Sequence, residues 1–431
     1  MKRILFDATP LAEGAVNKVD RTGIYFCTKN ILQELLLQKD IVIDFYCAPK
    51  VISVVECELE KLLYRKAKLI NKNCFNMILS NIWCRINKKR RVYKMSGHYL
   101  LNNILAVTEL VLEHVVNNMD VLNVTITNRY LFFLSTKYQA PKKVYKNKDI
   151  LKIIFLHDAI AIMHPEFFQV KFAKIRTSWI QHMINTMNNE EIYLTNSNYT
   201  KNDFLYCCPN ISENNFKVAY HACSDFFIKC ADENKITKVK AKYGIDLNKK
   251  YLFSLCAIEP RKNIIRIVKC FIRFIQKNNI EDMIMVLGGK AWSNFALEFE
   301  KQAGFNINKI PYVKTIGYVN DDDLPALYSG AEWFVYTSQY EGFGVPPLEA
   351  MSCGCPVIVS NNSSLPEVVG EAGILIDWDS DEQHIEAYEK YYYNSELRRE
   401  NSEKGLLQAQ KFSWSKCVNQ ILELAYTKTS L

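Results

Sequence analysis

Residues 339–365 read QYEGFGVPPLEAMSCGCPVIVSNNSSL, and this stretch decides the fold that we expect for the chain. A glycine-containing turn, Gly342-Phe343-Gly344, is followed by two prolines. Proline fits the first turn of a helix, because the N–H group that it lacks would have no partner there. The pattern therefore predicts a loop that opens a helix, and the helix ends at Gly354, a residue suited to a left-handed cap. Val357 to Ser360 then has the composition of a short buried strand.

Two carboxylates flank this turn: Glu341 stands just before the glycines and Glu349 lies eight residues later, inside the helix. A helix N-terminus attracts phosphate through its unpaired N–H groups and the helix dipole. Carboxylates accept hydrogen bonds from hydroxyl groups such as those of ribose and sugars. The loop, helix and strand together suit a nucleotide-sugar diphosphate. The alternative reading of the same letters is an ordinary capped surface helix.

Residues 315–377 as a whole resemble the donor-binding region of glycosyltransferase family 4, the "glycosyl transferases group 1". The resemblance rests on E-G-F-G-x-P-x-L-E-A-M at 341–351, C-G-C-P-V-I at 353–358 and S-L-P-E-V at 364–368. A pair of glutamates at this spacing occurs often by chance, but three motifs in this order do not. The resemblance, which extends to bacterial mannosyltransferase-like members, implies an α/β protein of the GT-B fold, with two Rossmann-like domains facing each other across a cleft.

The length and composition agree with two domains. A chain of 431 residues can hold two ordinary domains, and 49% apolar with 23% charged residues is typical of a folded globular protein. From the resemblance we expect an acceptor-binding domain over residues 1–235 and a nucleotide-sugar donor domain over residues 245–411. Residues 412–431 are expected to form a helix that crosses back to the N-terminal domain. The charged, loosely patterned segment 229–249 is the predicted linker.

The fourteen cysteines are scattered, without C-x-x-C pairs or a Cys/His metal spacing. No secretory signal is recognised, because the apolar run after Lys2-Arg3 stops at Asp7. No run approaches the roughly 18 to 20 apolar residues of a membrane-spanning helix. We therefore expect a cytoplasmic protein with reduced thiols and no metal site, with the inner face of the plasma membrane as a candidate peripheral location.

The segment 61–94 contains eleven basic residues and no acidic one, interleaved with apolar residues such as Leu62 and Trp83. A basic amphipathic segment of this kind is a candidate for binding an anionic membrane surface. It is equally compatible with a solvated face of helices that cover the N-terminal sheet. Nucleic acid is not expected as a partner, because no RNA- or DNA-binding motif accompanies the charge.

The N-terminal half begins with a strand, K-R-I-L-F-D, a turn-rich loop over 8–21, Gly23 and a helical run over 24–37. By resemblance, this glycine loop lies against the donor and acceptor. Strands are also predicted at 41–47, 120–127, 153–156, 191–197, 216–220, 251–256, 283–287, 313–316 and 331–338, and helices at 100–116, from 264 onward, at 321–329 and at 406–424.

His157 follows the strand at 153–156, at the carboxyl end where open α/β sheets bind ligands. The residues alone favour a hydrogen-bonded loop histidine. The family has a similar H-D followed by H-P-E-x-F, which implies that His157 approaches the sugar being transferred. Ser197 is expected to cap a helix, as in the family's S-x-x-S/T-K-x-D pattern. His221 departs from the family, which often has asparagine and glycine in that turn.

The run P-R-K-N at 260–263 follows a predicted strand and is similar to the family's phosphate-binding loop. Arg261 and Lys262 could neutralise two phosphates without a metal ion. The alternative is a solvent-facing basic loop. Cys256-Ala257 stand where the family usually has glycine and often a further basic residue, so Lys262 is expected to carry more of the phosphate role.

The resemblance implies a retaining hexosyltransferase, and the basic P-R-K-N loop favours one that works without a metal ion. By resemblance, the donor is a nucleoside-diphosphate sugar, with GDP-mannose favoured, and no cofactor is required. The acceptor is a glycan or lipid-linked molecule of bacterial surface polysaccharide synthesis. The donor phosphate, rather than a protein base, takes the acceptor proton. The alternatives are a non-catalytic nucleotide-sugar-binding partner and another GT-B activity, a phosphorylase or epimerase. The predicted catalytic residues are Glu341, His157, Lys262 and Arg261, and the predicted donor-binding residues are Glu349, Gly342, Phe343, Gly344, Val345, Tyr318 and Gly23.

Overall fold

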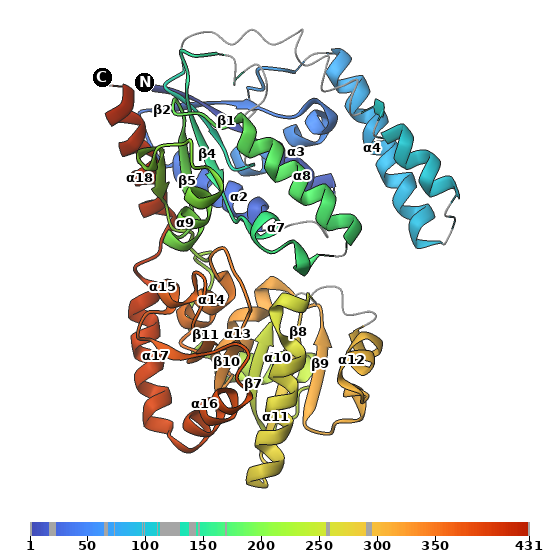
Figure 1. Ribbon diagram of the computed structural model, residues 1–431, viewed down its shortest axis with the longest axis vertical. Helices are drawn as coiled ribbons and strands as arrows, with labels where there is room; N and C mark the ends of the chain where they lie inside the picture. The colour runs from blue at the N-terminus through green and yellow to red at the C-terminus, as the bar shows by residue number, and fades with distance from the viewer. Residues whose placement is uncertain are drawn as a thin grey trace.

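Two six-stranded sheets, all of whose pairings are parallel, organise the chain (Figure 1). The computed structural model describes residues 2–16, 23–63, 68–72, 74–96, 98, 100–109, 111–112, 130–137, 144, 147–168, 170–255, 259–289 and 295–429. The first sheet has the strand order β2-β1-β3-β4-β5-β6 and the second β12-β11-β10-β7-β8-β9. Each sheet has helices packed on it, and the two resulting bodies are stacked along the long axis of the molecule.

The N-terminal body is built on strands that are buried almost throughout, as is usual for parallel sheets covered on both faces. Its strands are β1 (Lys2–Asp7), β2 (Ile41–Tyr46), β3 (Phe132–Ser135), β4 (Leu151–Leu156), β5 (Ile192–Thr195) and β6 (Phe216–Val218). Its helices are α1 (Thr9–Val16), α2 (Gly23–Leu36), η2 (Pro49–Val51), α3 (Ile52–Leu63), α4 (Cys74–Met95), α7 (Ile160–Met163), η3 (Pro165–Phe167), α8 (Val170–Thr186), α9 (Asn198–Cys207) and η4 (Glu213–Asn215).

Two parts of this body differ from the expectation. The predicted loop over 8–21 starts instead with helix α1, because the Asp7 carboxylate accepts the Thr9 N–H at 3.0 Å and Leu11 is buried. The strand between β1 and β4 is β3, whose F-F-L-S run was not predicted. The predicted strand at 120–127 lies outside the described residues, as do Cys256 and Ala257. The predicted helix at 100–116 is helical over 100–109 and 111–112.

The C-terminal body repeats the same alternation of strands and helices around a core that extends from Phe227 to Ala409. Its strands are β7 (Lys250–Leu255), β8 (Met283–Gly288), β9 (Val313–Gly317), β10 (Trp333–Tyr336), β11 (Val357–Ser360) and β12 (Gly373–Ile376). Its helices are α10 (Glu233–Lys242), η5 (Pro260–Lys262), α11 (Ile264–Asn278), α12 (Phe295–Ala303), η7 (Ile307–Lys309), η8 (Asp321–Asp323), α13 (Leu324–Ser329), α14 (Val345–Ser352), α15 (Leu365–Val369), α16 (Asp381–Tyr393) and α17 (Ser395–Ala409).

The stretch that decides the fold has the predicted local structure. Helix α14 starts after Gly344, whose φ of 98° requires glycine, and has proline in its first turn. The chain leaves the helix through Gly354, with a φ of 72°, and enters β11 at Val357.

The chain passes between the bodies twice, before α10 and before α18. Helix α10 lies within the segment predicted as linker, and its Ile236 and Val239 are buried in the core of the C-terminal body. Helix α18 (Trp414–Thr429) returns to the N-terminal body and packs against α2. Its buried side chains belong to the N-terminal core. The domain limits at 235, 245 and 411 remain predictions. Of the helices described, none combines the length and apolarity needed to cross a bilayer.

Candidate functional site

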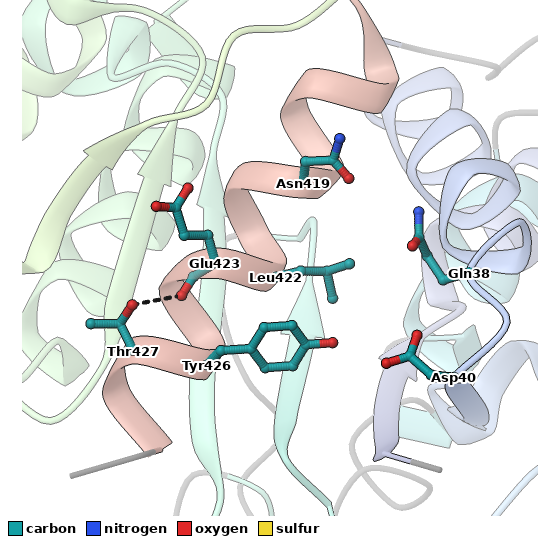
Figure 2. Close-up of a pocket in the computed structure, with 7 residues that line it drawn as sticks. All are labelled: Gln38, Asp40, Asn419, Leu422, Glu423, Tyr426 and Thr427. Atoms are coloured by element: carbon teal, nitrogen blue, oxygen red, sulfur yellow. Dashed lines mark hydrogen bonds between the residues drawn. The ribbon is translucent and has the colours of Figure 1, made fainter.

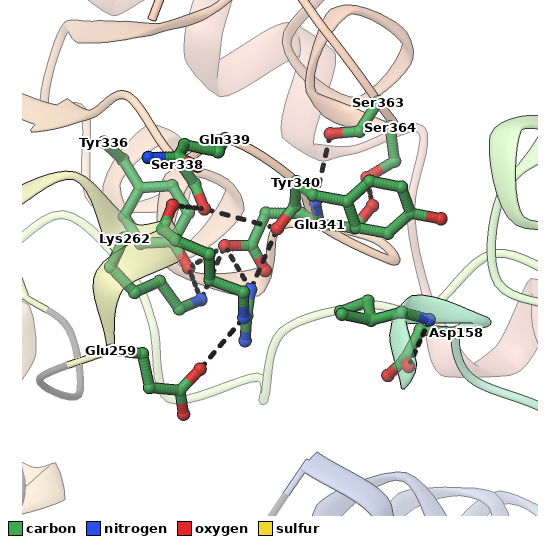
Figure 3. A network of polar contacts seen from close by, with 12 residues as sticks. Asp158, Glu259, Lys262, Tyr336, Ser338, Gln339, Tyr340, Glu341, Ser363 and Ser364 are labelled. Atoms are coloured by element: carbon green, nitrogen blue, oxygen red, sulfur yellow. Dashed lines mark hydrogen bonds and ion pairs between the residues drawn. The ribbon is translucent and has the colours of Figure 1, made fainter. Parts of the chain in front are cut away.

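Arg261, Lys262 and Glu341 meet in one buried ion-pair group (Figure 3). The turn after β7 carries the two cations, and the loop after β10 carries the carboxylate. Because β7 and β10 are neighbours in a parallel sheet, their carboxyl ends lie side by side. Lys262 Nζ lies 2.5 Å and Arg261 Nη1 3.0 Å from the same oxygen, Oε1 of Glu341.

Tyr336 completes this group, although the sequence analysis did not single it out. Its hydroxyl lies 2.9 Å from Glu341 Oε1 and 2.5 Å from Lys262 Nζ. Tyr336 is the last residue of β10, so its position at the carboxyl end of a buried parallel strand was the available signal.

The group sets the charge of its members. Burial alone would raise the pKa of Glu341, but Lys262 and Arg261 outweigh burial and lower that pKa to about 2. Burial lowers the pKa of Lys262, and the Glu341 charge opposes that shift. Burial also acts to lower the pKa of Arg261, but Glu341 and Glu259 raise it well above its ordinary value. Near neutral pH Glu341 is therefore ionised between two cations.

Hydrogen bonds to two backbone carbonyls hold the two loops of the group together. The Gln339 N–H donates to the Arg261 carbonyl at 2.7 Å, and the Ser338 hydroxyl donates to the same carbonyl at 3.0 Å. In return Arg261 Nη1 donates to the Tyr340 carbonyl at 2.9 Å. The positions of the cations relative to Glu341 are thus fixed by the chain as well as by charge.

Glu349 lies on α14, apart from this group, and receives a hydrogen bond from the Tyr328 hydroxyl at 3.0 Å. It is half-buried. Burial raises its pKa to about 8, against the lowering effect of Tyr328, and the charge of Asp321 adds to the rise. The two glutamates of the motif therefore have opposite protonation states at neutral pH.

The Gly342–Gly344 turn is packed against the N-terminal body. The Gly342 carbonyl accepts hydrogen bonds from the hydroxyls of Ser197, at 2.7 Å, and Thr200, at 3.0 Å. A Cβ atom on Gly342 would stand 2.4 Å from the His157 carbonyl oxygen, so only glycine fits here. Phe343 is buried among the rings of Tyr220, His221 and Phe412.

His157 is buried directly beside this turn. Its Nε2 lies 2.8 Å from the Thr136 carbonyl, and because a carbonyl only accepts, Nε2 carries the proton. Burial lowers the pKa of His157 to about 4, so the ring is neutral at pH 7. His157 is therefore a hydrogen-bonded loop histidine, as its residue type suggested, and it also lies next to the predicted donor turn, as the resemblance implied.

Cys27, His157 and His221 each bring one potential ligand atom to within 4.8 Å of the other two. All three are buried, and His221 lies between the rings of Phe155, Phe343 and Trp414. Within the described residues the cysteines are free thiols.

The remaining predicted donor residues are less closely linked. Val345 is the first residue of α14. Tyr318 follows β9 and is exposed. Gly23 is the first residue of α2, and a Cβ atom added to it would have no atom within 4 Å. Within the described part of the chain, neither Tyr318 nor Gly23 forms a hydrogen bond or ion pair with Glu341. A separate pocket between α18 and the start of β2, whose lining includes Asp40, Asn419 and Tyr426, is drawn in Figure 2. It lies at the amino end of β2, away from the strand ends that carry Glu341.

Two α/β bodies joined at their carboxyl-end loops, with an ion-pair group and a glycine turn at the joint, define a GT-B protein. Solved structures agree on the fold: Anabaena HepE in complex with UDP and glucose matches the whole chain at a TM-score of 0.63 and 15% identity. WaaG, a glycosyltransferase involved in lipopolysaccharide biosynthesis, matches 99% of both chains at a TM-score of 0.61 and 12% identity.

The family follows from closer relatives. The model for "Glycosyl transferases group 1" matches residues 235–408. The O-antigen chain mannosyltransferase B of Escherichia coli is 30% identical over 287 residues, 66% of this chain and 72% of the relative. The serotype-specific mannosyltransferase WbdA of Escherichia coli is 33% identical over 190 residues, 44% of this chain but 23% of the relative. The chain belongs to the group 1 glycosyltransferases, which confirms the resemblance and the fold.

Proposed function

We propose that this glycosyltransferase moves a mannose-like hexose from GDP-mannose to a glycan or lipid-linked acceptor during bacterial surface polysaccharide synthesis, with retention of configuration. The names of the two mannosyltransferase relatives support the sugar and the pathway class. The single observation that carries the reaction is the convergence of Arg261 and Lys262 on Glu341, in the loop that leads into α14.

The two cations are assigned to the leaving diphosphate. They are fixed in place before the donor arrives, since Glu341 binds both and the Tyr340 carbonyl accepts a hydrogen bond from Arg261. Preorganised charge aimed at a leaving group is usually the largest catalytic contribution. The positive end of the α14 dipole, at Val345, adds to it, although Pro346 and Pro347 contribute no N–H groups. This arrangement would serve the diphosphate without a divalent metal.

The two glutamates take separate roles in this proposal. Glu341 remains ionised and accepts hydrogen bonds from sugar hydroxyls, together with the backbone of Gly342–Gly344. Glu349, which accepts a hydrogen bond from the Tyr328 hydroxyl, holds the ribose hydroxyls. His157 stays neutral and positions the sugar from the N-terminal body.

The proposed chemistry keeps the new bond on the face of the old one. The bond between the anomeric carbon and the diphosphate oxygen breaks, and the bond to the acceptor oxygen forms on the same side. The acceptor proton passes to the departing phosphate oxygen. A sugar trapped covalently on an enzyme side chain would overturn this route.

A thermal-shift panel of GDP, GDP-mannose, UDP and UDP-glucose tests the donor site. A ligand at a hundred times its dissociation constant adds about 2.7 kcal/mol to the stability of the folded state. We expect GDP and GDP-mannose to stabilise the wild type and to lose most of that effect in Glu349→Ala, but not in Glu403→Ala, a surface control paired with Arg399.

Turnover and stereochemistry are then read by NMR of the product formed with mannosyl acceptors. An α-linked product from α-configured GDP-mannose is expected. An inverted product would contradict retention, and donor binding without turnover on any acceptor would favour the non-catalytic alternative.

A further inference from the structure

A group of three potential metal ligands is buried in the N-terminal body. Cys27 is on α2, His157 directly follows β4, and His221 lies after β6. One potential ligand atom of each residue lies within 4.8 Å of the other two. Bonds from a metal ion to nitrogen and sulfur are about 2.0 to 2.3 Å long, so small side-chain rotations would bring all three atoms onto one ion. Because the three residues come from distant segments, no metal spacing is visible in the sequence.

His221 has an unsatisfied ring nitrogen. The residue is only 6% exposed, and its Nε2 has no hydrogen-bond partner among the described residues. An unpaired polar atom in the interior destabilises a fold unless something binds it. Burial, together with the nearby His157, lowers the pKa of His221 well below its ordinary value, so the ring is neutral at pH 7. A neutral imidazole has a lone pair on one ring nitrogen and can therefore ligate a metal ion.

His157 is held in the manner of a metal-ligating histidine. Its Nε2–H donates to the Thr136 carbonyl at 2.8 Å, so the lone pair of the neutral ring is on Nδ1. Histidines that bind a metal usually donate their other ring N–H to a carboxylate or a carbonyl in this way. Thr136 also fixes the third ligand, because its hydroxyl lies 2.5 Å from the hydroxyl of Thr28, the residue after Cys27. The surrounding chain therefore orients these two ligands in advance.

The surroundings of the group favour a monovalent ion. Burial is the main cause of the pKa shifts of all three residues, and no carboxylate, lysine or arginine of the described residues contributes to them. Binding of a metal converts the Cys27 thiol to a thiolate and releases one proton to solvent. A monovalent cation on that thiolate gives a neutral site, whereas a divalent cation leaves a net buried charge, which is costly. Thiolate and imidazole ligands both suit copper, and a soft thiolate selects Cu(I).

We propose that Cys27, His157 and His221 bind one Cu(I) ion. The ion would join α2 to the turns after β4 and β6, next to the Phe343 ring of the glycine turn, and would stabilise the N-terminal body. The site goes beyond the proposed transfer reaction, to which we assign no metal. Removal of copper should therefore leave transfer intact, and the two proposals can fail separately.

The experiment is an anaerobic titration of the reduced full chain with Cu(I) in the presence of bathocuproine disulfonate, a chelator that competes for the ion. Cys27→Ala and His221→Phe each remove one ligand, and phenylalanine keeps a ring at position 221. Cys47→Ala is the matched control, because Cys47 is a buried thiol of the same core. A double variant, Cys207→Ala with Cys208→Ala, removes two thiols that contact methionine sulfur atoms.

We expect the wild type and both controls to retain one Cu(I) per chain and to unfold at a higher temperature with the ion than without it. Loss of a residue that only orients a ligand typically costs 10- to 100-fold in metal affinity, so loss of a ligand should cost at least about 100-fold. X-ray absorption of the wild-type complex should show one sulfur and two nitrogen neighbours. Metal-free His221→Phe should unfold no earlier than the metal-free wild type, because it lacks the unpaired nitrogen, so a loss of binding is not a loss of folding.

Three results would overturn the proposal. The wild type could retain no Cu(I) against the chelator, or Cys27→Ala and His221→Phe could retain it as well as the wild type. Coordination by sulfur alone would place the copper at other thiols. Retention of Zn(II) in preference to Cu(I) would contradict the charge argument, and the proposal would fall with it.

Discussion

The side-chain hydroxyl of Ser197 donates a hydrogen bond to the carbonyl of Gly342, so the first residue capping α9 also holds the glycine turn of the other body. Thr200 makes the same contact, and Glu367 accepts hydrogen bonds from the N–H groups of Asn198 and Tyr199. Two motifs of the sequence, the S-x-x-T of α9 and the S-L-P-E-V of α15, are therefore parts of one joint. The glycine turn assigned to the donor is positioned by both bodies.

Gly342→Ala should disturb this joint. The added Cβ would lie 2.4 Å from the His157 carbonyl, so the turn must move away from the N-terminal body. We expect a loss of about 1–3 kcal/mol in unfolding free energy, typical of overpacking, and at least a tenfold loss of transferase activity. Gly23→Ala is the control for stability, because no atom lies within 4 Å of its added Cβ. Unchanged stability and activity in Gly342→Ala would contradict the role of the turn.

Lys262→Met should separate the phosphate role from folding. The variant keeps the volume of the side chain but removes one of the two cations beside the leaving diphosphate. Removing one such preorganised group typically costs about 100- to 1000-fold in turnover, and we expect a loss of that size in kcat. Lys277→Met, in an exposed pair with Glu389, should retain full activity. If Lys262→Met turns over like the wild type, another group neutralises the diphosphate.

Glu341→Gln should lower stability in a pH-dependent way. The folded pKa of Glu341 is about 2, below its ordinary 4.5, so its contribution is present above pH 4.5 and is lost as the pH falls toward 2. Glutamine leaves Arg261 and Lys262 buried without their shared carboxylate, a change that costs about 3–5 kcal/mol for buried pairs. Urea unfolding should show the full difference at pH 7 and a smaller one at pH 3. A constant difference would show that charge is not its cause.

Glu349→Gln should have the opposite pH dependence. Its folded pKa of about 8 lies above the ordinary 4.5, so the folded chain keeps a proton that the unfolded chain loses. Wild-type stability therefore falls as the pH rises from 4.5 to 8, by at most roughly 5 kcal/mol. Glutamine does not ionise, so the variant should match the wild type near pH 5 and exceed it at pH 8. Urea titrations at these two pH values measure this, and a variant less stable at pH 8 would contradict the assignment.

Chelation should leave the transfer reaction intact. If Arg261 and Lys262 neutralise the diphosphate, incubation with EDTA or 1,10-phenanthroline followed by desalting should leave turnover within about twofold. Activity that is lost and then restored by one divalent ion would contradict the proposal. Cys27→Ser would then test the Cys27–His157–His221 group, since a thiolate ligand cannot be replaced by a hydroxyl without loss of a soft metal.

The sequence could predict the site to the extent that its residues are close in sequence or recur in a family pattern. Gly344, the prolines and Gly354 determine α14 locally, and its start and end follow from their backbone preferences. Arg261, Lys262 and Glu341 could be named from their motifs. That both cations share one oxygen of Glu341 could not be predicted from the sequence, because it depends on β7 pairing with the distant strand β10 as well as with β8, the next strand in sequence.

Other features depend on contacts between distant segments. Tyr336 enters the site because β10 ends beside Lys262, and within W-F-V-Y only its place at the carboxyl end of the strand distinguishes that tyrosine from a core residue. Helix α1 was missed because its capping by Asp7 and the burial of Leu11 outweigh a turn-rich composition. The polar side of the 100–112 helix faces inward because Asn87 and Arg90 of α4 bind the Glu109 carboxylate there.

Helix α18 ties the order of synthesis to the order of folding. The ribosome completes the N-terminal strands first, yet Trp414, Val418 and Ile421 enter the N-terminal core from a helix made after the entire C-terminal body. Domains made early generally fold as they emerge. Here the earlier body must keep an apolar surface uncovered until the later one has left the ribosome. A nascent chain arrested near Phe412 should therefore be a substrate for chaperones. Release of α18 should then allow the N-terminal core to be completed.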